Sequence, residues 1–191
     1  LSKEFAMKSS SVFQKHLWRM GLVLCFVLGG LVSVGSVETA RAATITVNSA
    51  ADVLANDLAC TLREAIINAN DDVATWVVCV GGTGNDTINF SSDMQINLVL
   101  SGASNEHLSA YGDLDITDSD GLTINGNGVT KTIINASALN PRERVFDIRV
   151  GSGAVEINNL TVTGGNSPGT QYRMEDTWGG GILNRSILTL N

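Results

Sequence analysis

The sequence predicts an all-β protein, a right-handed parallel β-helix with one short capping helix at its N-terminal end. From about residue 112 onward, short β-branched runs alternate with Gly and Asn, and part of the pattern recurs at an offset in the low to mid thirties of residues. A repeat of that length is typical of solenoids. Aromatic residues make up only 5% of the chain and there are two prolines. An antiparallel sandwich, the alternative, would show regularly spaced hairpin turns and a more aromatic core.

The N-terminus has the pattern of a secretory signal. Met7 is expected to be the true start, with residues 1–6 upstream of it. A basic n-region is followed by an apolar stretch over residues 21–34 and by the small-x-small site Ala40-Arg41-Ala42. An uncleaved membrane anchor, the alternative, needs about 20 apolar residues, more than this glycine-interrupted stretch offers. We therefore expect residues 1–42 to be removed and the mature chain to have no transmembrane span.

The charge of the remaining chain excludes one class of partner. Five of the 12 basic residues and two of the 19 acidic residues lie within residues 1–42, which leaves 17 acids against seven bases. A surface of that sign repels nucleic acid and anionic lipid. No nucleic-acid partner is therefore expected, and the signal pattern indicates a location outside the cell, secreted or at the cell surface.

Two cysteines remain once the signal is removed, Cys60 and Cys79. In an oxidising compartment two thiols are expected to form a disulfide, with two free buried thiols as the alternative. The mature part has one histidine, His107, and no Cys-x-x-Cys spacing, which argues against a zinc-type site.

Residues 43–111 are predicted to form a cap region that contains the one helix of the mature chain. Thr44–Val47 alternates like a strand, and Thr61 with Glu64 three residues later forms a capping box. The spacing predicts one apolar stripe along the helix, formed by Leu62, Ala65, Ile66 and Ala69. The acidic stretch 70–72 is expected to end the helix, and residues 86–90 to form a further strand.

Residues 112–191 are predicted to be the first coils of the β-helix, in a chain that is expected to be a fragment. Strands of three to five residues are expected within the β-branched runs 113–117, 122–125, 132–135, 145–148, 155–163, 181–184 and 187–191. Residues 145–148 recur as 181–184, and residues 155–158 recur as 187–191. Alternate side chains should point inward: Leu114 and Ile116, Leu122 and Ile124, Val155 and Ile157, and Leu188 and Leu190. Asparagines at strand ends should stack and exchange side-chain hydrogen bonds.

The run Cys60-Thr61-Leu62-Arg63-Glu64-Ala65-Ile66 resembles the domain family named for its Cys-Ser-Leu-Arg-Glu-Ala motif. Thr61 replaces the serine and keeps the N-cap chemistry. Residues 46–48, Asp52, and stretches 84–90, 112–117 and 179–184 also look like that family, so the resemblance covers nearly all of residues 44–191. It implies an N-terminal cap on parallel β-helices of bacterial secreted or surface proteins, and no defined catalytic residues. Glu64 and Arg63 are then expected to be structural, with Arg63 pairing to an acidic loop.

The candidate chemistry lies in four aspartates, Asp113, Asp115, Asp118 and Asp120. Asp113 and Asp115 are two apart on a strand, so they should face outward about 6.6 Å apart, near the separation of an inverting carboxylate pair. The preferred interpretation is a solvated strand face, forced by the burial of Leu114 and Ile116. The run 118–121 starts like a calcium loop, but Ile116 and Asn127 occupy the first and last ligand positions, which excludes an EF-hand and leaves a looser, weak calcium site open. No other cofactor is expected.

Two functions follow from these patterns. The first is a non-catalytic secreted or cell-surface β-helix that presents loops for adhesion or for binding polysaccharide or a host or cell-surface ligand. The second is a polysaccharide lyase or glycoside hydrolase with active coils beyond residue 191. No nucleophile motif accompanies His107, which is expected to be a loop residue. The aromatic residues Trp76, Tyr172 and Trp178 could stack on sugar rings or serve in packing.

Overall fold

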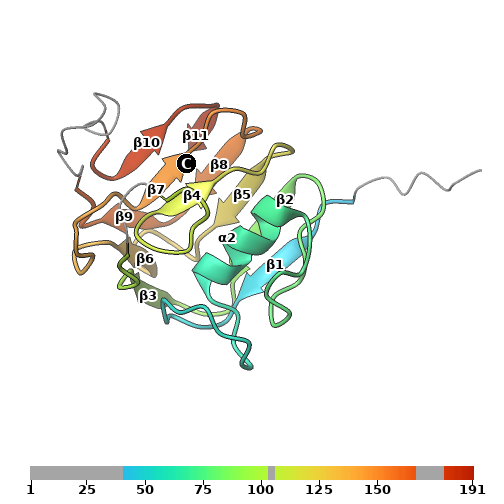
Figure 1. Ribbon diagram of the computed structural model, residues 1–191, viewed down its shortest axis with the longest axis horizontal. Helices are drawn as coiled ribbons and strands as arrows, with labels where there is room; N and C mark the ends of the chain where they lie inside the picture. Colours follow the sequence, from blue (N-terminus) through green and yellow to red (C-terminus); the bar gives the residue numbers. More distant parts are fainter. Residues whose placement is uncertain (1–40, 103–105, 167–178) are drawn as a thin grey trace, which may run out of the picture. The chain divides into compact units, whose positions relative to one another are not determined.

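The strands pair into three parallel sheets, which the computed structural model describes over residues 41–102, 106–166 and 179–191 (Figure 1). The five-stranded sheet has the order β1 (Thr44–Val47), β2 (Asp86–Phe90), β5 (Leu122–Asn125), β8 (Val155–Asn158) and β11 (Leu188–Leu190). A second sheet has the order β10 (Ile182–Asn184), β7 (Phe146–Ile148) and β4 (Leu114–Ile116). The third has the order β3 (Met94–Asn97), β6 (Thr132–Asn135) and β9 (Thr161–Thr163).

The chain visits these sheets in a fixed order. From β2 it passes to β3 in the third sheet and β4 in the second, then returns to the first sheet at β5 and repeats the circuit. The predicted recurrences are parallel neighbours: Phe146 pairs with Ile182, and Val155 pairs with Leu188. The repeat in the sequence is therefore the pairing partner of a strand in the structure.

Parallel pairing places side chains of the same kind above one another in columns. Ile45, Ile88, Ile124 and Ile157 are consecutive partners in the five-stranded sheet, and none is more than 4% exposed. Residues of all three sheets and of the helix share one buried hydrophobic cluster. Leu190 continues the column on the predicted side of its strand, but it is 60% exposed and so does not belong to the buried core. Its strand, β11, is the edge of the sheet.

The predicted asparagine stack is present at the ends of the strands of the five-stranded sheet. The side-chain amide of Asn125 donates to Asn89 Oδ1 (3.2 Å), that of Asn158 donates to Asn125 Oδ1 (2.9 Å), and that of Asn191 donates to Asn158 Oδ1 (2.8 Å). Each amide is both donor and acceptor, so the series ties successive strands together without consuming backbone groups.

One strand was missed, and one predicted run contains two strands. Met94–Asn97 forms β3, which the sequence did not indicate because only Ile96 in it is buried. The run 155–163 supplies two short strands, β8 and β9, which lie in different sheets. Asn159 lies between them with φ 53°, a left-handed conformation that asparagine adopts more readily than most residues and that turns the chain.

The helix α2 (Leu62–Asp71) contacts β1, β2 and β4 (Figure 1). It is more deeply buried than an amphipathic stripe predicts: all eight residues from Leu62 to Ala69 are buried, including Arg63, Glu64 and Asn68. Within the described ranges, no helix has the length and apolar character that crossing a membrane requires. The predicted signal segment falls almost entirely on residues outside these ranges.

Candidate functional site

The N-terminal end of α2 is held by the predicted capping box. Thr61 Oγ1 accepts from the backbone N–H of Glu64 (3.3 Å), and Glu64 Oε2 accepts from the backbone N–H of Thr61 (2.9 Å). Glu64 Oε1 also accepts from the N–H of Ala55 (2.8 Å). Both oxygens of this fully buried carboxylate are occupied by the backbone, so the role of Glu64 is structural.

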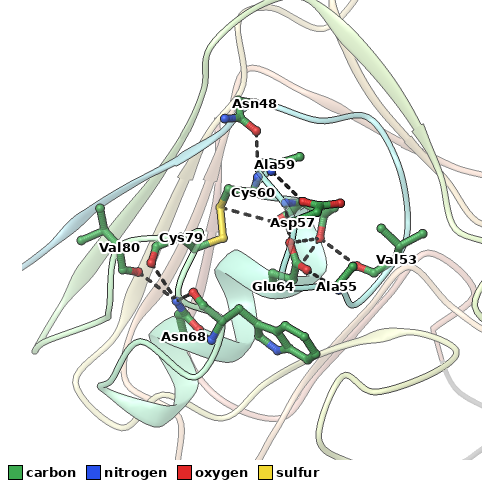
Figure 2. Close-up of a disulfide and its surroundings, with 12 residues drawn as sticks. Asn48, Val53, Ala55, Asp57, Ala59, Cys60, Glu64, Asn68, Cys79 and Val80 are labelled. Carbon is green, nitrogen blue, oxygen red and sulfur yellow. Dashed lines mark hydrogen bonds between the residues drawn. A yellow bond between two sulfur atoms is a disulfide. The ribbon is translucent and has the colours of Figure 1, made fainter.

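The predicted disulfide joins Cys60 to Cys79, with their Cα atoms 5.0 Å apart (Figure 2). It links the residue before the helix cap to the loop that follows the helix. Asn68 reinforces the same link, because its side-chain amide donates to the carbonyls of Cys79 (3.3 Å) and Val80 (3.1 Å). Figure 2 shows this amide directed from α2 toward the loop.

Arg63 pairs with a buried acid in the preceding loop, as predicted. Its Nε lies 2.6 Å from Asp52 Oδ1, and both side chains are at most 1% exposed. The guanidinium also donates to the carbonyls of Ser109 (2.9 Å), Gly112 (2.8 Å) and Asp113 (3.3 Å). One arginine therefore fastens α2 to the loop that leads into β4.

The pair also reaches the loop that follows β3. Asp52 Oδ2 accepts from the N–H groups of Val99 (2.6 Å) and Leu100 (2.9 Å). Further along α2, the side-chain amide of Asn70 donates to the carbonyl of Asp115 (2.8 Å) and accepts from the N–H of Thr117 (2.8 Å). Since β4 is the edge of its sheet, α2 supplies hydrogen bonds that a neighbouring strand would otherwise make.

Asp113 and Asp115 do not lie on a solvated strand face, so that prediction was wrong. Asp113 is 6% exposed and Asp115 is 0% exposed. The alternation is as expected, with Leu114 and Ile116 in the core, but the loop before β4 covers the other side. The hydroxyl of Ser109 in that loop donates to the carbonyl of Asp115 (2.9 Å) and accepts from its N–H (2.7 Å).

Burial changes the acidity of both groups. It raises the pKa of Asp113 to about 7, with further upward effects from Glu143 and Asp147 and an opposing effect from Arg144, which lies 3.3 Å away. Burial and the neighbouring Asp113 raise the pKa of Asp115 to about 8. Such values suit proton transfer, but neither carboxyl is open to a polymeric substrate.

Asp115 has a partner across the sheet that was not predicted: Asp147, its parallel neighbour on β7. Oδ2 of Asp147 lies 2.9 Å from Arg149, 3.7 Å from Arg185 and 3.8 Å from Arg144. Nδ1 of the exposed His107 lies 3.9 Å from Asp115 Oδ1. The partial burial of this histidine lowers its pKa, and the positive charge of Arg149 lowers it further. The shared pattern Leu-Asp-Ile at 114–116 and Phe-Asp-Ile at 146–148 was the signal that could have revealed the pair.

Asp118 and Asp120 belong to a different cluster, so the four aspartates predicted as one group form two. Their carboxylates lie within 4.8 Å of one another and of Asp72, the C-cap residue of α2. Asp118 is 1% exposed, and burial raises its pKa to about 6. Its Oδ1 accepts from the N–H of Asp120 (2.8 Å), whereas its buried Oδ2 has no partner among the described residues.

A pocket of about 270 Å³ lies beside the helix. Its apolar lining includes Leu54, Ile67, Trp76 and Leu108, and its polar lining includes Asn70 and Asp71. The indole Nε1 of Trp76 is buried and has no acceptor within the described part of the chain. The other two aromatic candidates, Tyr172 and Trp178, lie outside the described residues.

No protein-family model matches the chain, and searches of curated proteins and of solved structures give no match. The resemblance to the Cys-Ser-Leu-Arg-Glu-Ala family therefore rests on the residues that carry the motif.

Proposed function

We propose that the chain is the capped N-terminal part of an exported right-handed parallel β-helix that binds carbohydrate at a bacterial surface or outside the cell.

The β-helix is supported by the order in which the chain visits the three parallel sheets. A parallel sheet requires a crossover between neighbouring strands. Here the crossover from β1 to β2 contains α2, and every later crossover passes through the other two sheets before it returns. Parallel crossovers are right-handed in about 98% of cases, which is the basis for the proposed hand.

The cap is supported by the contacts of α2 with the open edge of β4. Arg63 and Asn70 bond backbone groups that would otherwise be unpaired at this edge. An unpaired edge next to an apolar interior is a site for end-to-end aggregation. A buried helix that is tied down by a disulfide closes that site, and a disulfide is consistent with an oxidising, exported location.

The observation that carries the binding function is the pocket beside α2. Sugar-binding sites commonly combine an aromatic side chain with a few polar groups that fix orientation. Trp76 supplies the aromatic surface and an indole N–H that lacks an acceptor among the described residues, while Asn70 and Asp71 supply polar atoms in the same lining. A neutral or amino sugar fits this lining better than a uronic acid, because Asp71 repels a carboxylate.

The alternative is a polysaccharide-degrading enzyme with active coils beyond residue 191. The raised pKa values of Asp113 and Asp115 resemble those of general acids. Their burial argues against this use, since a glycosidic bond has to reach the carboxyl group. The fold itself does not decide between the two functions.

The test is a titration of the purified protein with neutral and acidic oligosaccharides, followed by calorimetry and by tryptophan fluorescence. We expect binding of neutral sugars that is lost in Trp76→Ala and retained in Leu58→Ala, a control that changes a 98% exposed side chain outside the pocket lining. Circular dichroism establishes that both variants are folded. Equal binding by Trp76→Ala would refute the pocket, and turnover of a polysaccharide would favour the enzyme.

A further inference from the structure

The three carboxylates of Asp72, Asp118 and Asp120 converge from two segments that are far apart in the sequence. Asp72 is the C-cap residue of α2, in the left-handed conformation with φ 53°. Asp118 and Asp120 lie in the turn between β4 and β5. One carboxylate oxygen of each lies within 4.8 Å of the others, although like charges repel at that distance.

No ion pair of the described residues involves Asp72, Asp118 or Asp120. The ion pairs of the described lysines and arginines involve other acids, namely Asp52, Asp93, Asp113 and Asp147. The last turn of α2 contains no basic residue, although the C-terminal end of a helix carries partial negative charge.

A second observation is independent of the acidic composition. Oδ2 of Asp118 is buried in a side chain that is 1% exposed, and it makes no hydrogen bond of standard geometry with a described residue, although the backbone N–H of Gly121 lies near this carboxylate. Leaving a buried carboxylate oxygen unpartnered is costly. Oδ1 is already satisfied by the N–H of Asp120, so Oδ2 is the atom left to meet a ligand.

Hydrogen bonds within the protein orient the carboxylates of this cluster without a bound ligand. Asp72 Oδ1 accepts from the N–H of Gly84 (2.9 Å), which leaves its second oxygen for the cluster. Asp120 is exposed, so the site has an entrance from solvent. Three carboxylates with solvent access suit a hard cation that takes oxygen ligands and completes its shell with water.

We propose that Asp72, Asp118 and Asp120 bind one calcium ion, which joins the C-terminal end of the cap helix to the turn between β4 and β5. The cluster at His107, Asp115 and Asp147 is a poorer cation site, because three arginines surround Asp147. Calcium is favoured over magnesium because irregular carboxylate groups suit its flexible coordination, whereas magnesium requires a near-octahedral shell. With few protein ligands, the affinity falls in the range of extracellular modules, roughly 10⁻⁴–10⁻³ M.

The three carboxylates of this site come from two segments that are distant in the sequence. The run 118–121 lacks the ligands of a calcium loop at Ile116 and Asn127, as the sequence predicted. The third carboxylate instead comes from Asp72, which is separated from the turn in the sequence by the three strands β2, β3 and β4. Binding would stabilise the contact of the cap with the first strands, in an environment where calcium is plentiful.

The test uses the purified protein, stripped with a chelator and titrated by calorimetry and thermal unfolding up to ~10 mM CaCl₂, above the expected dissociation constant. We expect one ion per chain and a rise of several degrees in the unfolding midpoint, because a ligand that binds only the folded state stabilises it. Asp118→Asn should lose the response, with a fall in affinity of at least about tenfold. Asp120→Asn, a change at an exposed position, should give the same loss of calcium affinity. It tests the proposal if Asp118→Asn does not fold.

Asp93→Asn is the matched control, since Asp93 is an exposed aspartate that pairs with Lys131 and lies outside the cluster. It should retain full calcium binding. The proposal is overturned if the wild-type protein binds no calcium over this range, or if Asp120→Asn binds as tightly as the wild type. An equal rise in midpoint with magnesium in all variants would mean general screening of charge, and would overturn it as well.

Discussion

Replacing Arg63 by methionine should be among the most damaging single changes in the cap. The guanidinium makes two hydrogen bonds to Asp52 and three to backbone carbonyls, in a side chain that is fully buried. Methionine has a similar length and fills the space, but it donates no hydrogen bond. The change therefore isolates the polar contacts from the packing.

The loss of stability in Arg63→Met can be estimated from the buried groups that lose their hydrogen-bond donor. Asp52 would remain a buried carboxylate with only the N–H groups of Val99 and Leu100 as donors. Removing one partner of a buried ion pair costs about 3–5 kcal/mol, against a total stability of about 5–15 kcal/mol for a domain. Arg63→Lys keeps the charge but loses the forked geometry, so we expect roughly half of that loss.

Urea unfolding followed by circular dichroism measures these changes. Arg142→Ala is the matched control, because Arg142 is exposed, and such changes usually stay within about 0.5 kcal/mol. Combining Arg63→Met with Asp52→Asn should cost less than the sum of the two single changes, because the double variant leaves no unpaired charge. A loss in Arg63→Met no larger than that of the control, or strict additivity in the double variant, would refute the structural role assigned to the pair.

Three further predictions concern the core, the disulfide and export. Ile116→Asp should abolish cooperative unfolding, because it places an unpaired charge in a dry core at a cost of several kcal/mol; a native circular dichroism spectrum would contradict this. Reducing the bond between Cys60 and Cys79, which are 19 residues apart, should lower stability by about 3 kcal/mol in the chain-entropy treatment, whereas an unchanged urea midpoint would count against it. N-terminal sequencing of exported protein should begin at Ala43, and a product that retains the apolar stretch 21–34 would exclude cleavage after Ala42.

Much of the strand pattern could be predicted because it is local. Alternation in runs such as Leu122–Asn125 assigns both the strand and its buried face without knowledge of its neighbours. The recurrence of 145–148 at 181–184 then identified a pairing partner, since parallel stacking places equivalent residues side by side. Where the signal is weak, as in Met94–Asn97, only the pairing with β6 defines the strand.

The candidate sites were harder to predict because they depend on what lies across the fold. Alternation places Asp115 on the outer side of its strand, but it contains no information on the loop that covers that side. Asp72 and Asp147 meet the predicted aspartates through contacts between distant segments. The capping box at Thr61 and Glu64 was predictable for the opposite reason, because its partners are three residues apart.

The burial of Asp113 and Asp115 leads to a prediction about pH. Their carboxyl pKa values are raised from 3.8 to about 7 and about 8, so between these limits the folded state binds more protons than the unfolded state. Stability then falls as pH rises, because the slope of unfolding free energy with pH follows the difference in bound protons. The contribution is fully present below about pH 4 and is lost as pH passes through 7 to 8.

Asp115→Asn should therefore flatten the decline between pH 5 and 9 and stabilise the protein at its alkaline end, since the amide is never ionised. One pKa unit corresponds to about 1.4 kcal/mol, so the gain should be large enough to measure as a shift of several degrees in the unfolding midpoint. The hydrogen bond from Ser109 N–H to the side chain at 115 can persist in the variant, because the amide oxygen is still an acceptor. Asp93→Asn is again the control, because it makes the same chemical change at an exposed aspartate outside this pair. If Asp115→Asn and the wild-type protein decline in parallel from pH 5 to 9, Asp115 is ionised throughout that range and its burial does not govern its charge.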